Sequence, residues 1–302
     1  MLLNSSQTGF LPNEILNASY NYSAHEIEVL LAIVDFYRGE NSFTMNTDSL
    51  TQGFGKTNAL NKELKNAIRG ILEKPLEYWN AETKVMLISS VITSAQIDTN
   101  KREVKFTVNE TMGKILTHAK EKYSRYNFEV MLNLSSRYSK RLYLHCNAWR
   151  KTGVWEIKLD KLRKMLGVAD KYEQFYDFNT KILQPAFSEI NDKSEYVTTM
   201  DYLKNGKSYS SLLVSVTLKK EFVKTSQRQW AALKSFGLAD WQIKNVTASL
   251  SEYEIEKHIN HVKMHRHQIT NVGGWLVNTF KAVGVELDKK LYVNEEHKNT
   301  AL

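Results

Sequence analysis

The 302-residue sequence contains little cysteine and little proline: one cysteine, Cys146, and three prolines, at Pro12, Pro75 and Pro185. A single cysteine excludes an internal disulfide and any cluster of thiolate metal ligands. Cys146 lies on an apolar helical face, so we predict a small, buried hydrophobic side chain there. Without a proline-rich linker, domain boundaries must be found from the pattern of residues.

Long apolar runs and a secretory leader are also missing. No stretch of the sequence approaches the roughly 18 apolar residues that a membrane-spanning helix needs. The first ten residues, MLLNSSQTGF, have neither the basic start nor the long apolar centre of a signal peptide. We therefore expect no membrane partner and a cytoplasmic location.

The sequence does have an excess of positive charge. Lys and Arg number 41 against 33 Asp and Glu, and the formal net charge is +8 at pH 7. Such a balance favours a polyanionic partner, which can be DNA, RNA or an anionic membrane surface. The hydrophobic content of 42% is sufficient for buried cores, and the length is compatible with about two domains.

Residues 1–130 show the pattern of helices followed by a hairpin. Apolar spacing predicts helices at Glu14–Tyr20, His25–Tyr37, Thr47–Gly53 and Thr57–Glu73, and strands at Phe43–Met45, Glu77–Trp79, Lys84–Ile97 and Glu103–Val108. Ser23 and Glu26 match a capping box at the start of the second helix. This order of elements is typical of a winged helix.

The same order recurs in residues 131–222 after an offset of roughly 110 residues, which indicates a duplicated domain. Helices are predicted at Ser136–Lys151 and Leu159–Leu166, a short strand at Trp155–Ile157, and a wing hairpin at Tyr196–Leu203 and Ser210–Leu218. A long helix should begin near Asp177 as its N-cap, and Pro185 should kink it.

The pattern of residues 223–302 predicts a third, smaller unit. Helical spacing is found at Gln229–Phe236, Ala239–Leu250 and Glu252–His265, and Asn271–Val283 contains a predicted turn at Gly273–Leu276. Trp275 in that turn is either an exposed docking position for a host protein or a hydrophobic anchor. The expected fold class is therefore α+β, with two tandem winged-helix domains followed by a small helical unit.

A winged helix places one helix in the DNA major groove, where residues near its N-terminus reach base edges. In the second domain the predicted DNA contacts are Lys171, Gln174, Tyr176, Asn179, Thr180, Lys181 and Gln184 from the long helix and its preceding turn, Arg137, Lys140 and Arg141 from the first helix, and Lys204 and Lys207 from the wing. Glu173 and Asp177 oppose this interpretation, because carboxylates repel phosphates. The alternative is a solvated polar helix face.

The first domain offers a weaker set of DNA contacts, namely Lys56, Asn58, Asn61, Lys62 and Lys65. This domain can instead serve for dimerisation through its sheet.

Signals for metal or enzyme chemistry are weak. His258, His261 and His265 share a helix face with His267 close by, but no cysteine or carboxylate completes a zinc shell. The segment Gly53–Thr57 approaches a phosphate-binding loop but lacks the upstream glycine. His265-Arg266-His267 has neither the hydrophobic middle residue nor the tyrosine of a rolling-circle nickase. We predict no cofactor, no metal and no catalytic residues.

Several phrases resemble the iteron-binding plasmid replication initiators. These are NEILNASYNYSAHEIEVLLAIV in the first domain and SSRYSKRLY, WEIKLDKLRKMLGV and YDFNTKILQPAFSEIN in the second. The resemblance implies a non-enzymatic bacterial protein that binds repeats (iterons) in double-stranded origin DNA, mainly through the second winged helix. It also implies a homodimer through the N-terminal domain and recruitment of the host initiator and helicase.

One departure from that family concerns the long helix, where relatives usually carry Arg or Lys at the positions of Asn179 and Thr180. Lys181 would then carry more of the base contact. The competing hypotheses are a transcriptional repressor with the same fold and, among enzymes, a nicking relaxase.

Overall fold

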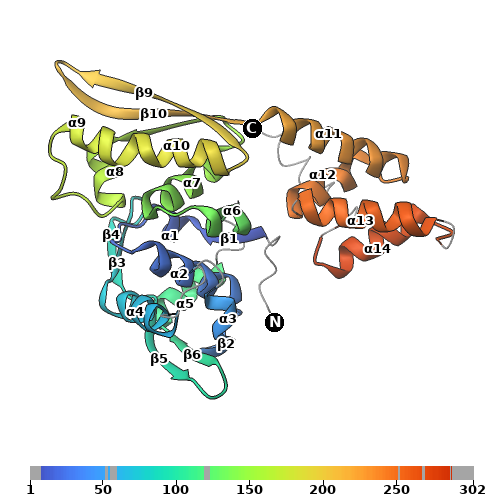
Figure 1. Ribbon diagram of the computed structural model, residues 1–302, viewed down its shortest axis with the longest axis horizontal. Coiled ribbons are helices and arrows are strands. Elements are labelled where there is room, and N and C mark those ends of the chain that lie inside the picture. Colours follow the sequence, from blue (N-terminus) through green and yellow to red (C-terminus); the bar gives the residue numbers. More distant parts are fainter. Residues whose placement is uncertain are drawn as a thin grey trace. The chain divides into compact units, whose positions relative to one another are not determined.

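The computed structural model describes residues 8–51, 54, 60–118, 123–250, 252–266, 269–285 and 287. These residues fall into two compact units, Met1–Leu218 and Lys219–Leu302. Figure 1 shows the ribbon of both, with most elements labelled. Among the described residues, no helix combines the length and apolar character needed to cross a lipid bilayer.

The first winged helix follows the predicted order. It consists of α2 (Ala24–Phe36), β2 (Ser42–Asn46), α3 (Thr47–Leu50), α4 (Leu60–Glu73), β5 (Ile92–Asp98) and β6 (Glu103–Val108). Its antiparallel sheet has the order β2-β6-β5. The predicted capping box is confirmed: the Ser23 hydroxyl accepts from the Glu26 N–H, and the Glu26 carboxylate accepts from the Ser23 N–H. The α2 helix therefore begins where its sequence signal lies.

The predicted stretch of strand at Lys84–Ile97 is wrong as one element. It divides into β4 (Val85–Ser89), which pairs with β3 (Leu76–Asn80), and β5, which pairs with β6. Val91 and Ile92 are both fully buried at the break. An uninterrupted strand sends successive side chains to opposite faces, so two consecutive core residues require the chain to turn there. The β3–β4 hairpin is thus an addition to the winged helix.

Further elements join the two winged helices. They are β1 (Thr8–Pro12), α1 (Asn13–Asn17), α5 (Glu110–His118), β7 (Tyr123–Asn127) and α6 (Phe128–Asn133). Strand β1 pairs antiparallel with β7, which is followed by α6 and then by the second winged helix.

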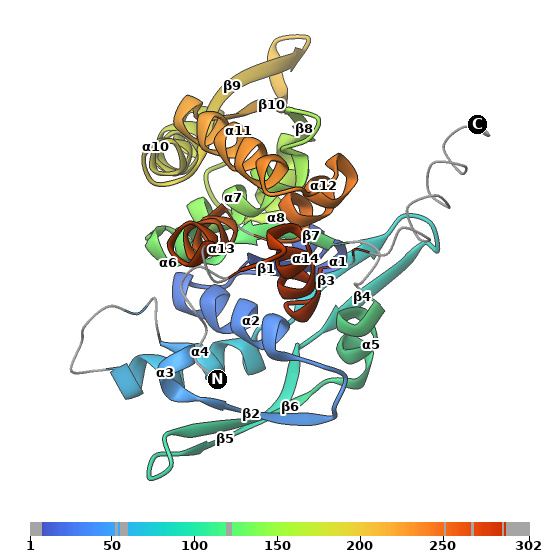
Figure 2. The ribbon, with the colours of Figure 1, turned by 90° about the vertical axis from the view of Figure 1, so that its right-hand side faces the viewer.

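The second winged helix repeats the topology of the first. It consists of α7 (Arg137–Trp149), β8 (Val154–Lys158), α8 (Leu159–Met165), α9 (Phe175–Phe178), η1 (Asn179–Leu183), α10 (Gln184–Lys193), β9 (Tyr196–Asn205) and β10 (Ser208–Leu218). Its sheet order β8-β10-β9 corresponds to β2-β6-β5. The predicted duplication is confirmed, and the two wings project from opposite ends of this unit (Figures 1 and 2).

The long helix of the second domain starts earlier than predicted and contains a π turn before Pro185. Its N-cap is Gln174, and Asp177 lies inside the first turn, so the predicted Asp177 cap is wrong. Phe175, the first residue of the helix, stacks its ring on Tyr209 of the wing. This contact fixes the start of the helix before Asp177. Before Pro185 the helix widens into the π turn η1, in which the Gln184 N–H donates to the Asn179 carbonyl. A wide turn accommodates a proline that cannot donate a backbone hydrogen bond.

One continuous hydrophobic core extends through both winged helices. The predicted burial of Cys146 is confirmed, and burial raises the pKa of its thiol. Gly167 ends α8 in a left-handed conformation (φ +66), where a Cβ would lie 2.9 Å from the Tyr20 carbonyl oxygen of the first domain. Glycine is therefore required where the two domains approach each other.

The described residues of the second unit form the helices α11 (Lys220–Ser235), α12 (Asp240–Ser249), α13 (Glu252–His265) and α14 (Val272–Ala282). The predicted turn at Gly273–Leu276 is wrong, because Asn271 caps α14 by accepting from the Gly274 N–H and the segment is helical. Trp275 is half-buried, packs against the core of this unit and stacks on His261, as the anchor interpretation expected.

Candidate nucleic-acid interface

The long helix of the second domain presents a polar, accessible N-terminal face. Tyr176 is 74% exposed. The side chains of Lys171, Gln174, Lys181 and Gln184 are also exposed. These five residues come from the preceding turn and the first half of the helix, the part that reaches base edges in a winged helix. Glu173 is exposed on the same segment, so one repelling carboxylate remains there.

The second carboxylate of this face is neutralised. Asp177 forms an i,i+4 ion pair with Lys181, and the Lys181 Nζ lies 2.7 Å from the Asp177 carboxylate. The hydrogen bond and the charge of Asp177 raise the pKa of Lys181. The lysine is therefore fully protonated at neutral pH, and contact with DNA must compete with its partner in the helix.

Asn179 and Thr180 are half-buried and held within the protein. The Thr180 hydroxyl donates to the Tyr176 carbonyl at 2.8 Å. The Tyr202 hydroxyl, from strand β9, donates to Asn179 Oδ1 at 2.5 Å. The hydroxyl of Thr180 is thus committed to its own helix, whereas Asn179 links the helix to the wing.

The wing carries two exposed lysines at its tip. Asn205 pairs with Ser208, which leaves Gly206 and Lys207 as a two-residue turn. Gly206 has φ +63, the conformation that a tight hairpin requires at its first central position. Lys207 is exposed, and the Nζ of Lys204 lies 4.8 Å from the centre of the Tyr209 ring.

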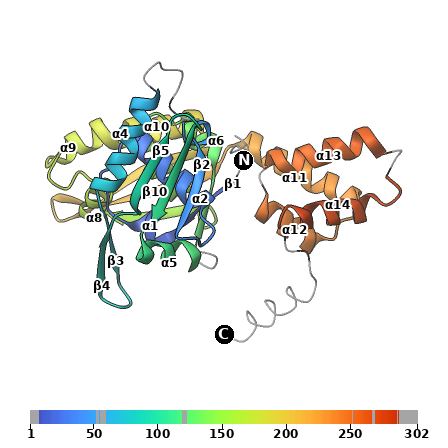
Figure 3. The same cartoon turned by 90° about the horizontal axis from the view of Figure 1, so that it is seen from below.

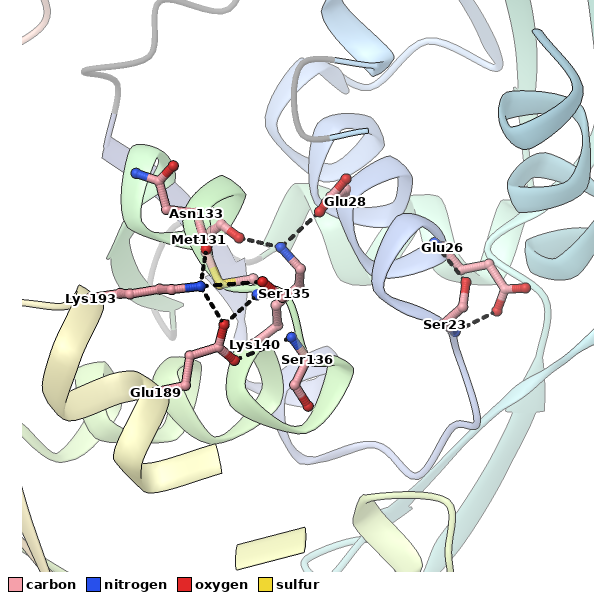
Figure 4. A network of polar contacts seen from close by, with 10 residues as sticks. All are labelled: Ser23, Glu26, Glu28, Met131, Asn133, Ser135, Ser136, Lys140, Glu189 and Lys193. Atoms are coloured by element: carbon pink, nitrogen blue, oxygen red, sulfur yellow. Dashed lines mark hydrogen bonds and ion pairs between the residues drawn. The ribbon is translucent and has the colours of Figure 1, made fainter. Parts of the chain in front are cut away.

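Lys140 and Arg141 do not belong to this surface, and their predicted phosphate contacts are wrong for this structure. Lys140 has no exposed surface; its Nζ lies 2.7 Å from Glu28 on α2 and also donates to the Met131 carbonyl (Figure 4). Arg141 donates to the Ala18 carbonyl and stacks over the Tyr20 ring. Helix α7 lies between the two domains, so these cations join the domains to each other.

Arg137 is half-buried at the same junction. Its guanidinium donates to Asn21 Oδ1 and to the Tyr138 hydroxyl. It retains partial access to solvent, so a phosphate contact from Arg137 stays a prediction.

Sequence reasoning missed three exposed lysines on and beside α8. Lys158 precedes this helix, and Lys161 and Lys164 lie on it. The sequence did indicate that these lysines are exposed, because their positions are out of phase with the buried Leu159, Leu162 and Met165. The helix before a recognition helix crosses the DNA backbone in helix-turn-helix proteins, so these lysines are suited to phosphate contact.

The first domain is only partly described at its candidate contacts. Lys56 and Asn58 lie outside the described residues, as does the side chain of Asn61. Lys62 and Lys65 are exposed on α4. Arg69 shares their helix face at i,i+7 from Lys62 and is also exposed, so this helix presents a basic stripe.

The histidines of α13 serve packing contacts. His261 stacks on Trp275 and on His265, and His258 meets Phe280 edge to face. Burial lowers the pKa of His258. His267 lies outside the described residues. Among the residues that the structure describes, no group of three or more His, Cys, Asp or Glu side chains is arranged to hold a metal ion.

Comparison with known proteins agrees with this arrangement. Residues 11–147 match the family model "Initiator Replication protein, WH1", and residues 158–216 match "Initiator Rep protein, WH2". The "Probable replication protein rep" of Bifidobacterium longum (strain NCC 2705) is 22% identical over 175 residues. That match covers 56% of this chain and 59% of the relative, so the chain spans less than two thirds of the relative's length.

A solved structure shares the fold. It is described as "Crystal structure of Pi initiator protein in complex with iteron DNA" and superposes with a TM-score of 0.59 at 16% identity, covering 72% of this chain and 100% of that chain. The two family models match consecutive parts of the chain and together span most of its length, with the WH1 match extending through most of α7. The chain therefore belongs to the initiator replication (Rep) protein family, with a WH1 domain followed by a WH2 domain.

Proposed function

We propose that this protein is a plasmid replication initiator that binds repeated origin DNA, called iterons, in a sequence-specific manner. The observation that carries the proposal is the exposed polar face of the long WH2 helix, from Lys171 to Gln184, beside a wing tipped with lysines. Family membership supports it, as does the fold shared with the Pi initiator, whose structure holds iteron DNA. The protein would act on plasmid DNA in the bacterial cytoplasm.

In this proposal, contacts divide into two kinds. Tyr176, Asn179, Lys181 and Gln184 read base edges, whereas the remaining exposed cations hold phosphates. The phosphate set comprises Lys158, Lys161, Lys164, Lys171, Lys204 and Lys207. Because each phosphate contact releases counterions, affinity for any DNA should fall steeply as salt rises.

The decisive experiment is replication of a plasmid that carries the cognate origin but lacks its own initiator gene. Supply of this protein in trans should restore replication, and footprinting should show protected repeats at the origin. Protection and promoter repression without replication would indicate a transcriptional repressor instead. Nicks in supercoiled origin DNA incubated with the protein and a divalent cation would indicate a relaxase.

Base reading by Lys181 predicts a measurable loss. Lys181→Ala should weaken binding to the specific repeat by roughly 1–3 kcal/mol and leave random-sequence binding nearly unchanged. The matched control is Lys114→Ala in α5, which removes a lysine from a comparable exposed i,i+4 ion pair with Glu110. Fluorescence anisotropy with both DNAs makes the comparison. An equal loss on both DNAs would identify Lys181 as a phosphate contact.

The WH1 domain offers a surface for a homodimer. Trp79, Met86 and Ile88 are 49%, 50% and 60% exposed. Trp79 pairs with Met86 across the β3–β4 hairpin, and Ile88 follows two residues later on the same strand, so the three share one face. The hairpin projects from the unit (Figure 3). A two-stranded hairpin is marginal alone, and an isologous partner would cover this face.

Dimerisation through this face predicts that Ile88→Glu weakens the dimer at least tenfold, since a carboxylate would be buried without a partner. Val85→Glu is the matched control, because Val85 is an exposed hairpin residue one position out of phase with that face. Analytical ultracentrifugation measures both. A dimer dissociation constant that is unchanged in Ile88→Glu would place the interface elsewhere.

Recruitment of the host initiator and helicase also forms part of the proposed function.

A further inference from the structure

We propose that Tyr202 is a positioning residue for sequence reading: it orients the carboxamide of Asn179 so that this side chain discriminates one base pair of the repeat. The proposal rests on the proposed function and assigns a role to a wing residue that lies outside the helix facing the bases. Its physical basis is a hydrogen bond between the helix and the wing, supported by a cluster of three rings.

The hydrogen bond joins two elements that are far apart in sequence. Tyr202 lies on strand β9, and Asn179 is the first residue of the π turn η1. The tyrosine hydroxyl donates to Asn179 Oδ1 at 2.5 Å. The backbone of Asn179 is held as well, because its carbonyl accepts from the Gln184 N–H across the wide turn. Both the side chain and the main chain of Asn179 are therefore fixed.

The ring of Tyr202 is itself held in place. It meets Phe175 edge to face, with the ring centres 5.0 Å apart, and Tyr209 at 5.9 Å. Phe175 and Tyr209 stack at 4.1 Å. These rings come from the start of the recognition helix and from both strands of the wing. A side chain locked by such packing can hold a neighbouring group in a single orientation.

The chemistry of the carboxamide explains why its orientation matters. Asparagine reads adenine when its oxygen accepts from the N6 amine and its nitrogen donates to N7. A rotation of the amide by 180° exchanges these roles and abolishes the match. The amide oxygen has two lone pairs, so it can accept from Tyr202 and from a base together. Burial raises the pKa of Tyr202 above its usual value, so the hydroxyl is protonated and acts as the donor.

A purely structural role for the hydrogen bond between Tyr202 and Asn179 predicts a different result. If the Tyr202–Asn179 bond only stiffens the domain, its loss lowers affinity for every DNA sequence by the same factor and lowers stability. If it orients a reading group, its loss changes discrimination at a single base pair. Affinity measured across sequences separates these two roles, which a single binding constant does not.

The experiment uses the full chain with Asn179→Ala, Tyr202→Phe and the double variant. Each protein is titrated against the origin repeat and against every single-base-pair variant of that repeat. We expect Asn179→Ala to lose discrimination at one base pair by roughly 5- to 150-fold, the range of a good side-chain–base contact. Tyr202→Phe should lose part of the discrimination at the same base pair, and the double variant should match Asn179→Ala.

The matched control is Tyr196→Phe. Tyr196 lies on the same strand, and its hydroxyl donates to Asn147 Oδ1 at 3.0 Å, so it is another tyrosine–asparagine pair, in which the asparagine lies on α7. This variant should lower stability without a change in base discrimination. Uniform loss across all sites, additive effects in the double variant, or no effect of Tyr202→Phe would each overturn the proposal. Failure of the unmodified protein to distinguish the repeat from random DNA would overturn the proposed function instead.

Discussion

Replacement of Lys140 by methionine should destabilise the WH1–WH2 unit by roughly 3–5 kcal/mol. Lys140 is fully buried, and its partner Glu28, on α2 of the other domain, is 5% exposed. Removal of the lysine leaves a carboxylate in the core without its counter-charge. Burial also lowers the pKa of Lys140 and raises that of Glu28, whereas their mutual attraction opposes both shifts. The ionised pair is therefore stable only while both partners are present.

Denaturant unfolding of the full chain measures this loss. The double variant Lys140→Met, Glu28→Leu should recover most of it, because well-packed apolar residues can replace a buried ion pair at little cost. Lys114→Met removes one partner of an exposed i,i+4 pair and should leave stability nearly unchanged. A single Lys140→Met variant as stable as the unmodified protein would contradict a domain junction held by this pair.

The fate of Lys140 and Arg141 shows where sequence reasoning stops. Both lie near the N-terminus of a helix rich in polar residues, which is typical of phosphate contacts. In the structure, every residue of Ser139–Asn147 is buried, because α7 is covered by WH1 on one side and by its own domain on the other. Amphipathic spacing assumes one buried face. It cannot identify a helix that lies between two domains.

The overall architecture could be predicted from the sequence more completely than the candidate site. The repeated order of elements identified the duplication, since turn and capping signals such as Ser23, Gly167 and Gly206 act locally. The β3–β4 hairpin was not separated, because its division from β5 depends on the core that receives Val91 and Ile92. Similarly, the bond from Tyr202 to Asn179 joins residues 23 positions apart and has no local signal.

The second large effect concerns pH and the buried carboxyl of Asp35 on α2. Burial raises its pKa to about 7, against hydrogen bonds from the Phe10 N–H and the Tyr126 hydroxyl that favour the charged form. The folded state therefore prefers the neutral carboxyl. Its contribution to stability is complete below the unfolded pKa of 3.8 and is lost as pH rises through about 7.

Asp35→Asn removes this titration while it keeps an oxygen that accepts from Phe10. Relative to Asp35→Asn, the unfolding free energy of the unmodified protein should fall between pH 4 and pH 7, by up to roughly 4 kcal/mol. His145 titrates with the opposite sign: burial lowers its pKa to about 3, so its contribution is lost as pH falls below about 6.5. Both proteins retain His145, so its contribution cancels when their unfolding free energies are subtracted. Denaturant unfolding at several pH values tests the prediction, and a difference independent of pH would show that Asp35 is ionised in the folded protein throughout this range.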